Sequence, residues 1–116
     1  ACLEPAVTIQ PGATAWIPTG IALEVPKGCA GLIYARSSLG TKRGLAPANK
    51  VGVVDSDYRG EIQVVLYNHS AMAQTVDNGE RIAQFLITPV LTPEYIETSE
   101  LSDTDRGTGG FGSTGA

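Results

Sequence analysis

Short hydrophobic segments rich in β-branched and aromatic residues alternate with turn-forming residues along most of the chain. This spacing predicts an all-β fold, such as a sandwich, a jelly roll or a barrel. No segment shows a sustained helical period, although residues 37–43 can hold one helical turn. The predicted strands are residues 13–17, 21–25, 30–35, 61–68 and 81–88. The predicted turns are residues 11–12, 18–20, 26–28, 59–60 and 77–79.

The segment from Ile62 to Tyr67 has apolar residues on both of its faces. A strand with one solvated face would instead alternate between apolar and polar residues. We therefore expect this strand to be central in its sheet or to be covered by another subunit.

Length and charge predict one small domain with a separate acidic extension. The chain has 116 residues and a formal net charge of −4, which argues against nucleic-acid binding because that needs a basic face. Residues 94–105 carry five acidic residues and no Lys or Arg. We therefore expect a β domain over residues 1–93, a solvated acidic arm over 94–105 and a glycine-rich segment over 106–116.

No apolar run approaches the length of a membrane span, and the first residues lack the pattern of a secretion signal. These features predict a cytoplasmic or otherwise intracellular protein without a membrane partner. In such a compartment Cys2 and Cys29 are expected to be reduced thiols rather than a disulfide. With His69 as the only histidine and no C-x-x-C pair, the chain has no metal-ligand cluster.

The segment 106–116 combines five glycines with Arg106, Phe111 and three hydroxyl-bearing residues. Such a glycine-rich backbone is costly to order unless a ligand stabilises it. A guanidinium, hydroxyls and one aromatic ring suit a partner that is anionic and planar, as a nucleotide is. The alternative is an ordinary disordered terminus.

Two groups of polar residues at strand ends also suit a nucleotide. Arg36, Ser37 and Ser38 follow a predicted strand, where hydroxyl and backbone N–H groups can hold phosphate oxygens while Arg36 supplies charge. An ordinary strand end is the alternative. Gln84 lies on an otherwise apolar strand and needs a partner, which a structural neighbour or a ligand can supply.

A further group consists of Asn49, Asp55 and Tyr58. An amide suits the edge of a base, a carboxylate can accept a proton from water, and a tyrosine ring can pack against a sugar. The alternative is a tight hairpin in which Asp55 or Asp57 caps backbone N–H groups.

Together these segments resemble the motifs of the trimeric deoxyuridine triphosphate nucleotidohydrolases (dUTPases). ARSSLG at 35–40 resembles the family's second motif, GVVDSDYRGE at 52–61 the third, GERIAQF at 79–85 the fourth and RGTGGFGSTG at 106–115 the fifth. The third and fifth are highly specific, and the four motifs cover essentially the whole chain.

The resemblance implies a homotrimer of jelly-roll-like (β-clip) subunits, each with a glycine-rich C-terminal arm. Its active sites would be shared between subunits, with the arm of one subunit closing as a lid over a site formed by the others. The implied reaction is hydrolysis of dUTP to dUMP and pyrophosphate, by Mg²⁺-assisted attack of water at the α-phosphorus. It would supply dUMP for thymidylate synthesis and keep uracil out of DNA. The triphosphate and water would hold the Mg²⁺, with no direct protein ligand.

The resemblance also implies a role for each matching residue. Asp55 would be the general base for the attacking water, and Tyr58 would pack against the deoxyribose and exclude a 2′-hydroxyl. Asn49 and the backbone around Val53 and Val54 would read the uracil edge.

Further roles concern the phosphates and the base. The phosphates would be bound by Arg36, Ser37, Ser38, Gln84, Arg106, Ser113 and Thr114. Phe111 would stack over the uracil, and Gln63 occupies a position that borders the substrate in relatives.

The sequence departs from the family pattern at two places. The first motif, a Gly-x-Asp-Leu-type strand with an aspartate near the metal site, would precede Ala1, and the sequence begins at its trailing edge. Ser38 stands where many relatives have glycine.

Two other functions are consistent with parts of the pattern. Arg-Ser-Ser also occurs in the deoxycytidine triphosphate deaminases, which share the fold, but their catalytic glutamate would fall near Val65, where this segment has no acidic residue. A non-catalytic nucleotide-binding module is the other alternative, and Asp55 argues against it because a carboxylate beside a triphosphate does not favour binding.

Overall fold

The computed structural model describes residues 5–112, and β-strands make up nearly all of its regular structure. The all-β prediction is confirmed. Cys2, Ser113 and Thr114, for which the sequence predicts a redox state or a phosphate contact, lie outside the described residues. The strands are β1 (Val7–Ile9), β2 (Thr14–Ala22), β3 (Cys29–Ala35), β4 (Leu45–Pro47), β5 (Gly52–Val54), β6 (Glu61–Asn68), β7 (Gln74–Val76) and β8 (Ala83–Pro89).

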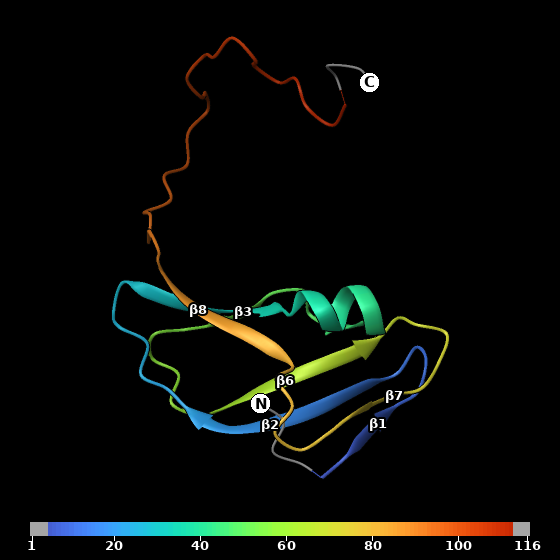
Figure 1. Ribbon diagram of the computed structural model, residues 1–116. Coiled ribbons are helices and arrows are strands. Elements are labelled where there is room, and N and C mark those ends of the chain that lie inside the picture. The colour runs from blue at the N-terminus through green and yellow to red at the C-terminus, as the bar shows by residue number, and fades with distance from the viewer. Residues whose placement is uncertain (1–4, 113–116) are drawn as a thin grey trace.

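The strands form two three-stranded antiparallel sheets and one two-stranded ribbon (Figure 1). One sheet has the order β2-β6-β4 and the other β5-β3-β8, while β1 pairs with β7. The two larger sheets bury their facing side chains in one core, to which Ile62 and Leu66 of β6 and Ile33 of β3 contribute. Strand β6 is therefore central in its sheet, as its sequence predicts.

The other face of β6 carries Gln63, Val65 and Tyr67, which are exposed or half-buried. Trp16 of β2 lies opposite Val65 in the register and is 70% exposed. Apolar residues thus occupy the outer face of this sheet, which accounts for the two-sided apolar pattern of β6.

The predicted turn at residues 18–20 is wrong, because β2 runs through it from Thr14 to Ala22. Proline is tolerated at a sheet edge, where its missing N–H leaves no ladder bond unmade, and β2 is an edge strand. The register opposite β6 shifts between Pro18 and Ala22, and Gly20 adopts a φ of 72°. The Pro-Thr-Gly sequence therefore forms an irregularity within a strand rather than a turn between two strands.

The predicted strand at 21–25 is accordingly wrong as a separate element, since only its first two residues belong to β2. The prediction at 30–35 matches β3 within one residue, and the prediction at 61–68 matches β6. The prediction at 81–88 matches β8 with both ends shifted. The sequence does not predict the short strands β1, β4, β5 and β7, because three residues are too few to show an alternation of apolar and polar positions.

A short π-type helix, η1 (Leu39–Arg43), connects β3 to β4, so the helical turn expected over residues 37–43 is confirmed. Gly44 ends it with a φ of 69°, and its N–H donates to the carbonyl oxygen of Leu39. A side chain at Gly44 would also meet Ser70, because an added Cβ would lie 2.8 Å from the Cβ of Ser70. Glycine is thus required there for both conformation and space.

Beyond β8, residues 90–112 form no strand or helix, and the segment extends away from the two sheets (Figure 1). Its apolar residues Leu91, Tyr95 and Leu101 are almost fully exposed. Strand β8 lies at the edge of its sheet, and its residues Phe85, Leu86 and Ile87 are each more than one-third exposed. Within residues 5–112, no helix has the length and apolar character needed to cross a membrane.

Lys50 is a non-glycine residue in the left-handed region, with a φ of 69° in the loop between β4 and β5. Such a conformation costs about 1–3 kcal/mol for a residue with a Cβ. We expect Lys50→Gly to raise the free energy of unfolding by about 0.5–1 kcal/mol, because it removes this strain but adds backbone entropy to the unfolded chain. Urea unfolding at a fixed protomer concentration measures the change. Lys42→Gly, in η1, is the matched control and is expected to be destabilising; stabilisation by both variants would contradict the prediction.

Candidate active site

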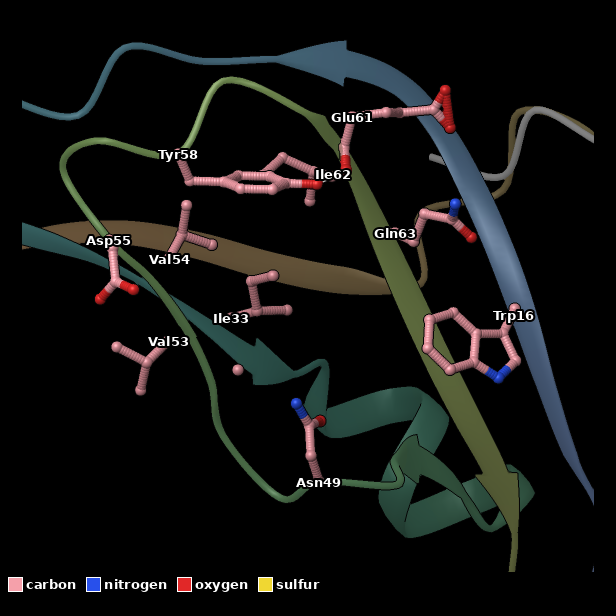
Figure 2. Close-up of a pocket in the computed structure, with 11 residues that line it drawn as sticks. Trp16, Ile33, Asn49, Val53, Val54, Asp55, Tyr58, Glu61, Ile62 and Gln63 are labelled. Atoms are coloured by element: carbon pink, nitrogen blue, oxygen red, sulfur yellow. Dashed lines mark hydrogen bonds between the residues drawn. The ribbon is translucent and has the colours of Figure 1, made fainter.

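A cleft of about 310 Å³ opens between the segment 49–58 and the strands β2 and β6 (Figure 2). This volume is at the lower end of the range for small-molecule sites, about 300–1,000 Å³. Polar and apolar groups share its walls, which suits a ligand with a planar ring and polar edges. The residues that line it are Trp16, Ile33, Asn49, Gly52, Val53, Val54, Asp55, Tyr58, Glu61, Ile62 and Gln63.

Strand β5 places two of the predicted residues at the cleft, and their side chains differ in burial. Val54 is 8% exposed and packs in the core, whereas Val53 is 63% exposed. β5 lies at the edge of its sheet and pairs only with β3 among the described strands. Alternate N–H and C=O groups of β5 therefore face away from β3 and are available to a ligand.

The loop between β5 and β6 carries Asp55 and Tyr58, and hydrogen bonds within the chain fix its shape. The Tyr58 N–H donates to the carbonyl oxygen of Asp55 at 3.2 Å, and the Tyr58 hydroxyl donates to the carbonyl oxygen of Glu61 at 2.8 Å. Arg59 donates to the carbonyl oxygen of Ser56 at 2.8 Å. In Figure 2 the Tyr58 ring points from the loop toward β6.

Asp55 is exposed at the start of this loop. Within residues 5–112, no hydrogen bond joins the carboxylate of Asp55 or Asp57 to a backbone N–H, so the capping alternative does not explain this turn. Asp55 is thus an exposed carboxylate on the wall of a cleft, where it can accept a proton from a bound water.

Asn49 completes the group from the loop between β4 and β5. The backbone carbonyl oxygen of Asn49 accepts a hydrogen bond from the Val51 N–H at 2.8 Å, and its side chain is exposed at the cleft. A Cβ at Gly52 would lie 3.5 Å from the Asn49 amide nitrogen and 3.2 Å from the Cβ of Ile33. The contact with Ile33 would be tight, whereas the contact with the Asn49 amide would be an ordinary one, so glycine at this position mainly gives space for Ile33.

Arg36, Ser37 and Ser38 lie at the junction of β3 and η1, where both serines are exposed. The Ser38 side chain makes no capping hydrogen bond at the start of η1. None of the three residues lines the cleft at Asp55. One chain therefore keeps the predicted phosphate-binding residues of the second motif apart from the predicted catalytic residue.

Gln84 lies on β8 and has a structural partner, since its side-chain amide donates to the carbonyl oxygen of Ala35 at 2.8 Å. It contributes to a second, mainly apolar cleft of about 280 Å³ that also includes Ile21, Ile82 and Phe85. The side chain remains exposed, so this bond leaves part of the amide accessible. A structural neighbour therefore supplies one hydrogen-bond partner of Gln84, which is one of the two possibilities that the sequence leaves open.

An ion pair between Arg43 of η1 and Glu80 links the second motif to the turn of the fourth. Arg43 also donates to the carbonyl oxygen of Thr75, and Glu80 accepts a hydrogen bond from the Asp77 N–H at 2.9 Å. Both charged side chains are roughly three-quarters buried. The helix after Ser38 and the turn before Gln84 therefore form one connected unit.

Arg106 and Phe111 lie in the extended C-terminal segment and do not line the cleft. The Arg106 side chain donates to the carbonyl oxygen of Gly109, and the Gly107 N–H donates to the Thr104 hydroxyl at 3.0 Å. Phe111 is fully exposed with a φ of 51°. This segment thus has local turns but no packing partner within the described residues.

Of the predicted residues, the structure brings Asn49, Val53, Val54, Asp55, Tyr58 and Gln63 together around one cleft. Trp16 and Glu61 also line this cleft, although the sequence pattern indicates no role for either residue. Trp16 is the only tryptophan, but its place at the cleft depends on the pairing of β2 with β6, which the sequence does not reveal.

Comparison with known proteins identifies relatives over nearly the whole chain. A sequence profile of the dUTPase family matches residues 2–115. The chain is 49% identical to the deoxyuridine 5′-triphosphate nucleotidohydrolase of Desulfitobacterium hafniense, over 99% of this chain and 77% of that protein. Its structure resembles the Staphylococcus bacteriophage 80alpha dUTPase with dUpNHpp, with a TM-score of 0.90, 27% identity and coverage of 99% and 83% of the two chains. It also shares its fold with a mutant dUTPase of phage phi11 that holds a structural Mg(II) ion, with a TM-score of 0.75, 22% identity and coverage of 85% and 80%.

Proposed function

The chain belongs to the dUTPase family, and from this membership we propose that it hydrolyses dUTP to dUMP and pyrophosphate. The observation that carries the proposal is the cleft that joins Asn49, Asp55 and Tyr58. It provides an amide for a base edge, a ring for a sugar and a carboxylate for a water within one short segment. The dUTPase of Desulfitobacterium hafniense aligns with 99% of this chain.

Base selection rests on Asn49 and β5. The Asn49 amide both donates and accepts, and the free edge of β5 adds backbone donors and acceptors. A uracil edge presents alternating acceptors and a donor, so these groups can match it. The backbone around Val53 and Val54 is assigned the exclusion of a 5-methyl group.

Water activation is assigned to Asp55. This carboxylate orients a water molecule and accepts its proton while the water oxygen attacks the α-phosphorus and pyrophosphate leaves. Tyr58 packs against the deoxyribose and excludes a 2′-hydroxyl. Gln63, on the opposite wall of the cleft, borders the bound nucleotide.

Phosphate binding is assigned to the unit that contains η1 and the turn at Glu80. Arg36, Ser37 and Ser38 provide a guanidinium and exposed hydroxyls for phosphate oxygens, and Gln84 adds its remaining amide group. The ion pair of Arg43 with Glu80 links η1 to the turn that precedes Gln84. Arg106, Ser113 and Thr114 complete the phosphate site when the C-terminal segment closes, and Phe111 covers the uracil.

Mg²⁺ is the proposed cofactor, and the donor set fits an ion held mainly by the substrate. Within residues 5–112, no group of three or more His, Cys, Asp or Glu side chains converges as a metal site. Mg²⁺ commonly retains waters and binds substrate phosphates rather than an all-protein cage. When bound, it neutralises charge that grows on the phosphate oxygens.

The separation of the phosphate-binding residues from Asp55 supports a homotrimer with shared sites. One chain forms the cleft but places neither Arg36 nor the extended segment at it. The exposed apolar residues Trp16 and Phe85 provide surface for contacts between subunits. Residues 106–116 then act as a lid over a neighbouring subunit's site, connected to the domain by the acidic arm at 94–105.

Shared sites predict that two inactive variants restore activity when mixed. One variant lacks the Asp55 carboxylate, and the other ends at Asp105. After the two are unfolded and refolded together at equal amounts, about a quarter of the sites should combine an intact Asp55 with an intact lid, if the lid comes from another subunit and assembly is random. Pyrophosphate release measures the recovery, and each variant refolded alone is the control. A mixture as inactive as its components would show that each chain supplies its own lid.

Substrate choice provides the direct test of the proposed reaction. The protein is incubated with Mg²⁺ and each of dUTP, dCTP, UTP and dTTP, while pyrophosphate and ammonia are followed separately. We expect pyrophosphate from dUTP alone. Ammonia from dCTP would indicate a deaminase, and binding without either product would indicate a nucleotide-binding module. In the cell the proposed reaction supplies dUMP for thymidylate synthesis and keeps uracil out of DNA.

A further inference from the structure

Gly60 makes a closer approach to the ring of Tyr58 than any residue with a side chain allows. A Cβ added to Gly60 would lie 2.3 Å from the Tyr58 hydroxyl oxygen, 2.6 Å from Cζ and 2.9 Å from Cε1. These distances are shorter than those that real Cβ atoms show. Its φ does not lie in the left-handed region, so glycine serves here for space rather than for conformation.

The Tyr58 ring is held over Gly60 by the hydrogen bond from its hydroxyl to the carbonyl oxygen of Glu61. Tyr58 is 44% exposed, so burial in the core does not fix its ring. A side chain at position 60 would occupy the space of the ring and its hydroxyl. The ring would then have to rotate away and give up the bond to Glu61.

The backbone of the loop cannot easily move instead of the ring. The Tyr58 N–H is bonded to Asp55, the Arg59 side chain is bonded to Ser56, and β6 begins at Glu61, directly after Gly60. Displacement of the ring is therefore the response that breaks the fewest contacts. Because Tyr58 lines the cleft, that displacement changes the shape of the cleft wall.

We propose that Gly60 is a positioning residue that sets the selectivity for the 2′-deoxy sugar by seating the Tyr58 ring against the cleft. This inference rests on the proposed function of the site, because it assigns the sugar to Tyr58. Gly60 itself does not line the cleft and acts only through the ring.

The test compares kcat/KM for dUTP and UTP in Gly60→Ala. We expect the ratio of the two values to fall by about tenfold or more, because the displaced ring no longer excludes the 2′-hydroxyl. Turnover of dUTP by the unmodified protein tests the proposed function separately. An unchanged ratio in a folded Gly60→Ala would overturn the inference about Gly60 while leaving the proposed reaction intact.

Gly28→Ala is the matched control for a general loss of stability. Gly28 has a φ of 84° and no atom within 4 Å of an added Cβ, so alanine strains the backbone there without a clash. Its melting temperature should fall while the dUTP to UTP ratio is unchanged. A lowered ratio in Gly28→Ala would show that the ratio reports stability, and this would contradict the inference.

A double-mutant cycle with Tyr58→Ala tests whether Gly60 acts through the ring and also covers poor folding of the single variant. Without the ring, Gly60→Ala should change neither the dUTP to UTP ratio nor the melting temperature beyond the effect of Tyr58→Ala. If Gly60→Ala lowers the melting temperature equally with and without the ring, Gly60 does not seat Tyr58 and the inference is wrong.

Discussion

Replacing Asp55 with Asn is expected to lower kcat for dUTP by about 10²–10⁴-fold, the range for loss of a general base. Asn cannot accept the proton of the attacking water, whereas its size preserves the exposed loop at the start of which Asp55 lies. Affinity for dUpNHpp, a dUTP analogue, should be unchanged or higher, because the substitution also removes a negative charge near the phosphates. Steady-state kinetics and calorimetric titration measure the two quantities.

Asp57→Asn is the matched control, because Asp57 is an exposed carboxylate in the same loop that does not line the cleft. Its kcat should remain close to that of the unmodified protein. Retention of more than about a tenth of kcat in Asp55→Asn would contradict the assignment of the general base. An equal loss in both variants would show that loop charge, rather than proton transfer, controls the rate.

Ending the chain at Asp105 is expected to reduce kcat/KM strongly without unfolding the domain. The described part of the removed segment has no packing partner in the chain, and Phe111 is fully exposed. The melting temperature should therefore change by no more than about 2–4 °C, the shift that corresponds to about 0.5 kcal/mol. Thermal unfolding and pyrophosphate release are measured on the same preparation.

Two point variants test whether the kinetic loss comes from the Phe111 ring or from the missing length of the C-terminal segment. Phe111→Ala should reproduce much of the kinetic loss, since it removes the ring that we propose covers the uracil. Leu101→Ser, at an exposed apolar position outside the fifth motif, should have little effect. A large drop in melting temperature on truncation, with full activity in Phe111→Ala, would mean that the segment stabilises the fold instead.

The parts of the fold that the sequence predicts best are those set by local pattern. Strand β6 matches its prediction because its run of hydrophobic residues follows directly after a clear turn signal at Arg59 and Gly60. Strand β2 does not, because local turn chemistry at Pro18 is overridden by its position at the edge of a sheet. Strand β5 is too short for a periodic pattern, although all three of its residues line the cleft.

The candidate site divides in the same way. The sequence groups Asn49, Asp55 and Tyr58 because they lie close together along the chain, and they line one cleft from the loops at the two ends of β5. Trp16 and the pairing of Arg43 with Glu80 depend on contacts between distant segments, which hydrophobic pattern alone does not encode. The clash that requires glycine at position 60 appears only once the direction of the Tyr58 ring is known.

The open edge at β8 has a consequence for how the protein would reach the proposed trimer. A single folded chain exposes Phe85, Leu86 and Ile87 on an edge strand, which is a surface that other chains can pair with in the wrong arrangement. Ordered association and irregular aggregation therefore compete for the same newly folded subunits. The yield of active protein after refolding should pass through a maximum as protein concentration rises, because dilution leaves subunits unassembled and crowding favours aggregates.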